Sequence, residues 1–275
     1  MPTFPARTAH ERQATGHRAI RAGGAWALCV LALAATACGG TASSTSGPAS
    51  GPAAALDPST TGTVTGRVVL TGTPPAAQTI RVDGDKTCAA LVPGAARLTE
   101  SYVVGADGAL ANAFVYVKTG LEGRTFPVPS EPVVVDQQQC WYTPRVVGVR
   151  VGQPLQVLNS DPLLHNVRAE AAINQPFNQG QPARGMRYSH TFSTDEVMVA
   201  LSCDVHAWMH AWVGVMNHPY FAVTGDDGTF SLPDLPAGTY VVEAWHEAAG
   251  TTTGTVAVTA QGTAVLTLSL PVPSA

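Results

Sequence analysis

The feature that most constrains the fold of this chain is a series of short segments in which apolar and polar residues alternate. A period of two places every second side chain on one face of an extended strand, so each segment predicts a strand with one buried face. Gly and Pro, with 27 and 21 copies, separate the segments, and no helical period lasts longer than two turns. With 45% apolar residues, enough for a packed core, the pattern predicts an all-β fold. The predicted strands are TVTGRVVL (63–70), ANAFVYVKTG (111–120), two within VVGVRVGQPLQVLN (146–159), SHTFS (189–193), EVMVALSC (196–203), AWVGVMN (211–217), TTTGTVAVTA (251–260) and TAVLTLSL (263–270).

Turn-forming residues predict the connections between these strands. The pair Asp227-Gly228 lies between two alternating runs and predicts a β-hairpin. Residues 170–188 are polar and contain Pro and Gly, which predicts a long loop. The stretch DGDKTCAAL (83–91) also predicts a loop.

The charge pattern disfavours one class of partner. The formal net charge is −4, and only 12% of the residues are charged. Nucleic-acid binding needs clustered basic residues, which this sequence lacks, so we expect no nucleic-acid partner. The hydrolase motif GxSxG, the metalloprotease motif HExxH and the P-loop are also missing from the sequence.

The N-terminus has the pattern of an export signal. Four arginines precede the apolar run AWALCVLALAATA (25–37), which is too short for a membrane-spanning helix but typical of a signal peptide. The segment AATACGG resembles the lipobox of bacterial lipoproteins, with Ala35 where Leu is usual. The resemblance implies that residues 1–37 are removed and that Cys38 carries the lipid; a plain secretory signal cut near Ala37 is the alternative. Residues 38–61 are rich in Ser, Thr, Gly, Ala and Pro, which predicts a flexible linker to a lipid anchor in the cell envelope.

Three cysteines remain once Cys29 and Cys38 are set aside. An oxidising compartment favours disulfides, but three thiols cannot all pair. We expect a disulfide between Cys88 and Cys140; two separate buried thiols are the alternative. Cys203 is then the free cysteine.

Cys203 lies in LSCDVHAWMHAWV (201–213), followed at intervals of three residues by His206 and Met209. His165 follows a predicted strand in NSDPLLHNV (159–167). A thiolate, a thioether and two imidazoles favour copper, and a His₂Cys set with a distant axial Met is typical of blue-copper electron-transfer sites. Zinc fits less well, because Met is a poor zinc ligand. The alternative for Cys203 is an inert buried thiol.

These two segments resemble the cupredoxins. YTPRVVGVRVGQPLQVLNSDPLLHNV (142–167) is similar to their strand–turn–strand entry to the first ligand, and SCDVHAWMHAWVGVMN (202–217) is similar to their ligand loop, with the spacing of amicyanin. The resemblance implies a Greek-key β-sandwich over residues 125–217. It also implies that His165, Cys203 and His206 are equatorial copper ligands, that Met209 is the axial ligand, and that Asn166 hydrogen-bonds across to the cysteine loop. His210, directly after Met209, is a competing ligand.

A second resemblance involves both flanks of this region. VTGDDGTFSLPDLPAGTYVVEAWHE (223–247) resembles the carboxypeptidase regulatory-like domain, a transthyretin-like β-sandwich, and GTVTGRVVL (62–70) and LANAFVYV (110–117) resemble its earlier strands. The separation of these pieces implies that the cupredoxin-like domain is inserted in a sandwich formed by residues 62–124 and 218–275. That family is generally non-catalytic.

The combined expectation is a lipid-anchored copper protein that passes single electrons to a redox partner protein. We expect it not to be an enzyme, because four protein ligands leave no open position on the metal. Two alternatives stay open: a copper carrier or sensor, and a structural binding sandwich with a vestigial metal loop.

Overall fold

Alternating residues form strands throughout the computed structural model, which describes residues 57–274. The predicted signal peptide (1–37), the predicted lipidation site Cys38 and most of the predicted linker (38–61) lie outside the described residues. A short 3-10 helix, η1 (Pro58–Thr60), precedes the first strand, β1 (Thr61–Thr71). Asp57 caps this helix by accepting the backbone N–H of Ser59.

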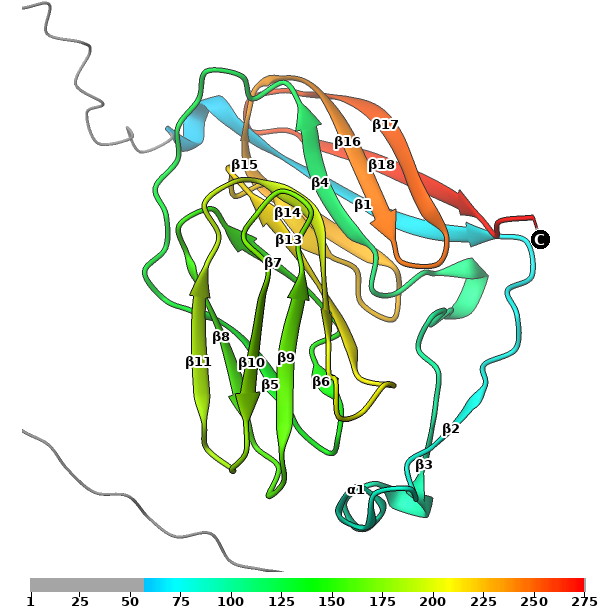
Figure 1. Ribbon diagram of the computed structural model, residues 1–275. Coiled ribbons are helices and arrows are strands. Elements are labelled where there is room, and N and C mark those ends of the chain that lie inside the picture. Colours follow the sequence, from blue (N-terminus) through cyan, green and yellow to red (C-terminus); the bar gives the residue numbers. More distant parts are fainter. Residues whose placement is uncertain (1–56, 275) are drawn as a thin grey trace, which may run out of the picture. The chain divides into compact units, whose positions relative to one another are not determined.

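Strands from the beginning and the end of the described chain form one β-sandwich, here called the terminal sandwich. Its sheets have the strand orders β15–β1–β18 and β14–β4–β16–β17 (Figure 1). Both sheets bury side chains in one apolar cluster, which includes Val64 and Leu232 from the first sheet and Val115 and Val242 from the second. The strands after β1 are β4 (Phe114–Thr119), β14 (Phe221–Val223), β15 (Thr229–Pro236), β16 (Gly238–His246), β17 (Gly250–Val258) and β18 (Thr263–Pro271).

The strands between β4 and β14 form a second sandwich, here called the central sandwich. Its sheets have the orders β10–β9–β12–β13–β7 and β11–β8–β5–β6. Val157 and Leu155 from the smaller sheet and Val199 and Val213 from the larger one share a single buried cluster. The strands are β5 (Val133–Gln137), β6 (Tyr142–Thr143), β7 (Val146–Arg150), β8 (Pro154–Asn159), β9 (His165–Glu170), β10 (Phe177–Gln181), β11 (Arg187–Thr191), β12 (Glu196–Ser202) and β13 (His210–Met216).

The segment between β1 and β4 includes a short hairpin and a short helix. Strands β2 (Thr79–Arg81) and β3 (Ala96–Leu98) pair with each other, and α1 (Lys86–Leu91) lies between them, followed by the 3-10 turn η2 (Pro93–Ala95). A further 3-10 turn, η3 (Ala106–Gly108), leads back to β4. The buried side chains Val82, Cys88 and Val92 of this segment belong to the core of the central sandwich rather than to that of the terminal sandwich.

A third, smaller cluster joins the two sandwiches. Phe114 and Tyr116 of β4 pack against Val146 and Met216 of the central sandwich. Arg145 adds a buried ion pair with Glu247, with Nε and Oε1 2.5 Å apart. The contact surface therefore combines aromatic packing with one paired charge.

Three expectations about the connections are corrected by the structure. The predicted hairpin at Asp227-Gly228 is wrong, because β14 pairs with β4 and β15 pairs with β1, so this turn carries the chain from one sheet to the other. Residues 170–188 are not one loop: they contain β10 and the start of β11. Most of β10 is exposed at the edge of its sheet, which explains its polar sequence. The predicted loop 83–91 contains α1, which Asp85 caps.

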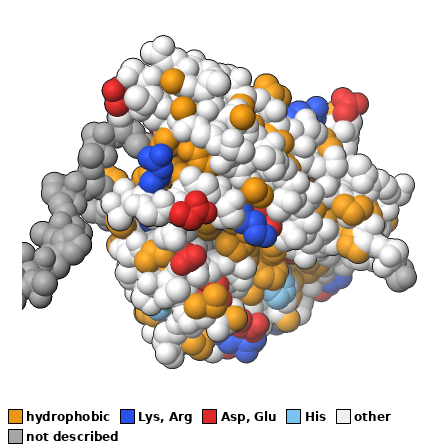
Figure 2. All heavy atoms as spheres, turned by 90° about the horizontal axis from the view of Figure 1, so that it is seen from above, with side chains coloured by type: hydrophobic (Ala, Val, Ile, Leu, Met, Phe, Trp, Pro, Cys, Tyr) orange, Lys and Arg blue, Asp and Glu red, His pale blue; other side chains and the backbone are white. Residues whose placement is uncertain are grey.

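Surface charge is sparse on the face drawn in Figure 2, where Lys and Arg side chains lie apart from one another and form no continuous basic patch. Among residues 57–274, no helix has the length and apolar character needed to cross a membrane.

Candidate metal centre

The sequence-predicted ligands come from one end of the central sandwich. His165 is the first residue of β9, and Cys203 directly follows β12, the neighbouring strand in the same sheet. His206 and Met209 lie in the connection from β12 to β13. Because β12 pairs antiparallel with both β9 and β13, all four residues lie at the same end of these three strands. All four are buried, with exposed fractions of 0% for His165 and Met209, 2% for His206 and 4% for Cys203.

Three of the four predicted ligands converge. The Nδ1 atoms of His165 and His206 are 3.0 Å apart, and the Sγ of Cys203 lies 3.8 Å from the Nδ1 of His206. One donor atom from each of these residues lies within 4.8 Å of the other two. Two ring nitrogens this close need either a hydrogen-bonding proton or a metal ion between them.

Met209 occupies the same buried cluster as Cys203. Its backbone N–H donates to the carbonyl oxygen of His206 at 3.0 Å, which closes a tight turn between the two residues. His210, the competing ligand, is exposed and starts β13 opposite Ser202. Met209 is buried and His210 is exposed, so Met209 is the better candidate for a metal ligand.

The electrostatics of the site favour a thiolate. Burial alone raises the pKa of the Cys203 thiol, but hydrogen bonds from His165 and His206 outweigh burial and lower that pKa to about 5. Burial likewise lowers the pKa of His165, but the Asp161 carboxylate and Cys203 outweigh it, so the net shift of that pKa is upward. The thiolate is the form of cysteine that binds metals, so Cys203 is held in the ligating state at neutral pH.

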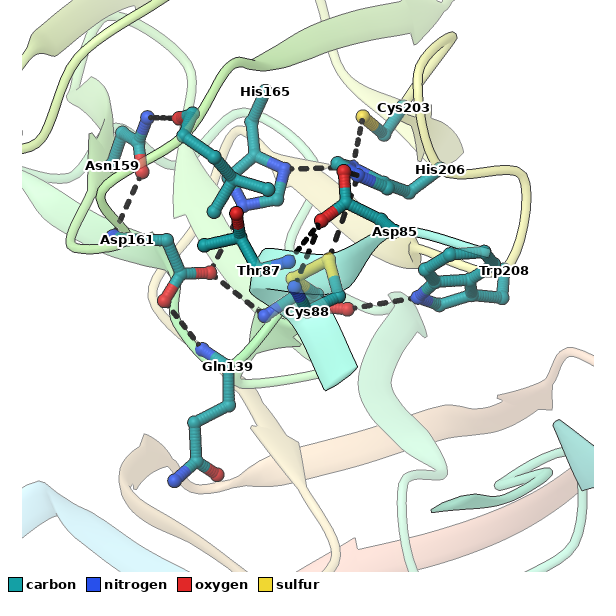
Figure 3. The surroundings of a disulfide bond; sticks show 12 residues. Asp85, Thr87, Cys88, Gln139, Asn159, Asp161, His165, Cys203, His206 and Trp208 are labelled. Carbon is teal, nitrogen blue, oxygen red and sulfur yellow. Dashed lines mark hydrogen bonds and ion pairs between the residues drawn. A yellow bond between two sulfur atoms is a disulfide. The ribbon is translucent and has the colours of Figure 1, made fainter. Parts of the chain in front are cut away.

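Asp161 holds the outer nitrogen of His165. Its Oδ2 lies 2.9 Å from His165 Nε2 and also accepts the backbone N–H of Cys140 at 2.7 Å, while its Oδ1 accepts the N–H of Gln139 at 2.8 Å. Figure 3 shows this carboxylate between the imidazole ring and the turn before β6. The contact assigns the proton of His165 to Nε2 and leaves Nδ1 directed at His206.

Asn166 links β9 to the cysteine loop. Its Oδ1 accepts the backbone N–H of Asp204 at 2.6 Å and lies 3.4 Å from Cys203 Sγ. Its amide nitrogen donates to Asp204 and to Asn178 of β10. Tyr142 adds a second link, because its hydroxyl donates to the carbonyl oxygens of Asn166 and Ser202. These bonds hold the two ligand-bearing segments together without a metal.

A disulfide lies beside the site. Cys88 of α1 and Cys140 are joined, with an S–S distance of 2.03 Å, whereas Cys203 forms no disulfide with another described residue. The Sγ of Cys88 lies 3.5 Å from His206 Nε2, and the indole N–H of Trp208 donates to the carbonyl oxygen of Cys140 at 3.0 Å (Figure 3). The disulfide therefore contacts the edge of His206 that faces away from His165.

The donor set fits copper. Two imidazole nitrogens face each other, one thiolate lies beside them, and a thioether is buried in the same cluster. A thiolate and two imidazoles suit both zinc and copper, but the thioether favours copper, because structural zinc sites use Cys and His without Met.

Three features near the site are missing from the sequence predictions. Asp161 is one of them, although it precedes His165 by four residues and lies two residues after the end of β8. That spacing is the signal that could have identified it. Asp85 and the position of the disulfide have no such signal, because they lie far from the ligands in the sequence.

Comparisons with known proteins give partial matches only. No family model matches the sequence, and no curated protein matches it. Among solved structures, a Cu-containing nitrite reductase from Thermus scotoductus SA-01 is 21% identical over 37% of this chain and 25% of its own, with a TM-score of 0.30. An oxidized mutant of amicyanin is 21% identical over 37% of this chain and 97% of its own, with a TM-score of 0.29. A purple cupredoxin from Nitrosopumilus maritimus is 24% identical over 27% of this chain and 81% of its own, with a TM-score of 0.25. The match to the nitrite reductase thus spans only a quarter of that protein.

Proposed function

We propose that this protein binds one copper ion in a type 1-like site and transfers single electrons. His165, Cys203 and His206 are the equatorial ligands, and Met209 is the axial ligand. The observation that carries this proposal is the 3.0 Å approach of the two Nδ1 atoms beside the buried Cys203 sulfur. Bound copper would supply a one-electron redox couple.

The residues around the ligands support electron transfer rather than turnover of a substrate. Asp161 holds the ring of His165, and Asn166 and Tyr142 tie the ligand loop to β9. A site held in this way needs little rearrangement when the metal changes its charge. Four protein ligands leave no open position, so the protein is not proposed to be an enzyme. The burial of the ligands favours retention of the metal, which argues against a copper carrier or sensor.

The wider arrangement is part of the same proposal. The cupredoxin-like domain (125–217) is inserted in a carboxypeptidase regulatory-like sandwich (62–124 and 218–275). The sheet orders support this division except for residues 79–98, whose buried side chains pack in the central sandwich. Removal of residues 1–37 and lipidation of Cys38 would anchor the protein in the cell envelope, where a redox partner protein would receive the electron.

Copper reconstitution tests the proposed function. Addition of Cu(II) to the purified metal-free protein is expected to give an intense visible band from thiolate-to-copper charge transfer, with one copper bound per chain. Cys203→Ser should abolish the band, because serine offers no thiolate. His206→Gln should weaken copper binding strongly, whereas His210→Gln, the matched imidazole at an exposed position, should leave it unchanged. A wild-type protein that binds no copper, or that keeps its band in Cys203→Ser, would contradict the proposal.

A further inference from the structure

A segment that connects two strands of the terminal sandwich packs against the candidate metal centre. Residues 79–98, which comprise β2, α1, η2 and β3, lie between β1 and β4 of that sandwich. Their apolar side chains Val82, Cys88 and Val92 nevertheless pack in the core of the central sandwich. The Cys88–Cys140 disulfide fastens the segment there. The ligand end of the central sandwich is therefore built in part from sequence that lies outside residues 125–217.

This segment covers the outer edge of His206. The His206 side chain is only 3% exposed, and its Nε2 faces the Oδ2 of Asp85 at 3.7 Å and the sulfur of Cys88 at 3.5 Å. Figure 3 shows Asp85 and the disulfide on this side of the ring, and His165 and Cys203 on the other. Of these two outer contacts, only the carboxylate is a strong acceptor for an N–H.

The two oxygens of Asp85 have separate partners. Oδ1 accepts the backbone N–H groups of Thr87 and Cys88 at 2.7 and 2.9 Å and thereby caps α1. Oδ2 is the oxygen that faces the imidazole. Aspartate ordinarily ionises at about pH 4, and two backbone donors stabilise this carboxylate, so it is an anion at neutral pH.

The tautomer of His206 connects this contact to the ligands. A neutral imidazole carries one proton, and the nitrogen that carries it cannot bind a metal. An anionic oxygen beside Nε2 favours the proton on Nε2, which leaves the lone pair of Nδ1 directed at His165 Nδ1 and Cys203 Sγ. His165 has a closer contact of the same kind, because Asp161 Oδ2 lies 2.9 Å from its Nε2. Each imidazole of the site thus has a carboxylate at its outer nitrogen.

We propose that Asp85 is a positioning residue of the metal centre: its negative charge beside Nε2 favours the proton on that nitrogen and so directs the Nδ1 lone pair of His206 at the metal. The role of the metal rests on the proposed copper function, whereas the effect on the ring itself does not. Carboxylates that hold ligating histidines typically change metal affinity by about 10- to 100-fold when removed. Because Asp85 is 3.7 Å from the ring and its side chain is 36% exposed, we expect the lower end of this range.

Asp85→Asn separates the two roles of this side chain. Asparagine keeps an oxygen for the N–H groups of Thr87 and Cys88, so α1 stays capped, but it places an NH₂ group toward Nε2. Asp83→Asn is the matched control, because Asp83 lies on the same segment and bonds only to Arg81 among the described residues. We expect Asp85→Asn to bind Cu(II) about 10-fold more weakly in competition with a chelator, with a shifted visible band. Asp83→Asn should behave as wild type, and Asp85→Glu should restore part of the loss.

A measurement on the metal-free protein tests the same contact independently. The ring ¹⁵N chemical shifts of His206 report which nitrogen carries the proton. We expect Nε2 of His206 to be protonated in the wild type and in Asp83→Asn, with a further proton shared between the two Nδ1 atoms in the absence of metal, and Nε2 to lose protonation in Asp85→Asn. If the wild type binds no copper but shows this tautomer change, the proposed function fails while the role of Asp85 stands. If the wild type gives the blue site but Asp85→Asn matches Asp83→Asn in affinity, spectrum and tautomer, the role of Asp85 is overturned and the function is not.

Discussion

At the scale of single residues, Asp161 is the side chain that connects the most parts of the site. It is 2% exposed and accepts hydrogen bonds from His165, Gln139 and Cys140. It therefore joins His165, a candidate ligand, to the turn that contains Cys140 of the disulfide. Burial raises its pKa, but these hydrogen bonds outweigh burial and lower that pKa overall, so Asp161 stays ionised at neutral pH.

Asp161→Asn should weaken both the metal site and the fold. The new NH₂ group cannot accept from His165 Nε2 or from the Cys140 N–H, so two buried donors lose their partner. We expect Cu(II) affinity to fall by about 10- to 100-fold and the free energy of unfolding to fall by about 1–3 kcal/mol. Chelator competition and urea unfolding measure the two effects. Asp136→Asn is the control, because Asp136 accepts from Ser160 nearby but does not contact a ligand; equal affinities for the two variants would contradict the role of Asp161.

At the scale of elements, two glycines decide how the sandwiches pack. Gly148 of β7 and Gly214 of β13 stand opposite each other in the parallel pairing of these strands. A Cβ atom on Gly214 would lie 2.4 Å from the ring of Phe114, and one on Gly148 would lie 2.2 Å from the ring of Phe221. The two missing side chains thus leave a flat surface on which aromatic rings of β4 and β14 lie.

Gly214→Ala should destabilise the protein without changing its metal ligands. The added methyl group overlaps the ring of Phe114, which is fully buried. Overpacking of this kind typically costs about 1–3 kcal/mol. Gly180→Ala is the matched control, because a Cβ atom there meets nothing within 4 Å. Urea unfolding that gives equal midpoints for the two variants would show that the sandwiches do not depend on this contact.

At the scale of the whole molecule, His218 ties the two sandwiches together. It follows β13 of the central sandwich, and its Nε2 donates to the carbonyl oxygen of Val117 in β4 of the terminal sandwich at 2.9 Å. Its Nδ1 accepts the backbone N–H of Tyr220 at 3.2 Å. In the neutral imidazole, Nε2 is a donor and Nδ1 is an acceptor, so both nitrogens have a partner. A second proton, on Nδ1, would point at the Tyr220 N–H and could not form a hydrogen bond with it. Burial lowers the pKa of His218 to about 4, from an ordinary value of 6.5.

This histidine predicts a loss of stability in acid. Between pH 6.5 and about 4 the unfolded chain binds a proton at His218 that the folded chain does not, so the free energy of unfolding decreases as the pH falls through this window. Above pH 6.5 His218 contributes no pH dependence. At pH 4.5 the loss amounts to on the order of 2 kcal/mol.

His218→Gln isolates this contribution. Glutamine keeps an N–H donor for Val117 but does not titrate. Urea unfolding of the metal-free wild type and of His218→Gln, at pH 7 and at pH 4.5, should show a smaller decrease for the variant. Equal decreases would mean that the link between the sandwiches does not depend on the charge of His218.

Most strands could be predicted from the sequence, because alternation is a local property that a strand expresses directly. β1, β12 and β13 match their alternating runs closely. The segments that were predicted wrongly are those whose structure depends on the strands packed beside them. β10 is polar because it lies at a sheet edge, and Asp227-Gly228 joins two sheets because β14 finds its partner in β4 and not in β15. α1 lacks a helical period because it is too short to show one.

The donor types of the candidate site could be predicted from the sequence, because Cys203, His206 and Met209 follow one another at fixed short spacing. The surroundings of those donors depend on how distant segments pack. Asp85 and Cys88 reach His206 across more than a hundred residues of chain, through the packing of residues 79–98 in the core of the central sandwich and through the disulfide to Cys140. No local sequence pattern predicts such a contact. It depends on which strands pair and on the packing of residues 79–98 in the core of the central sandwich.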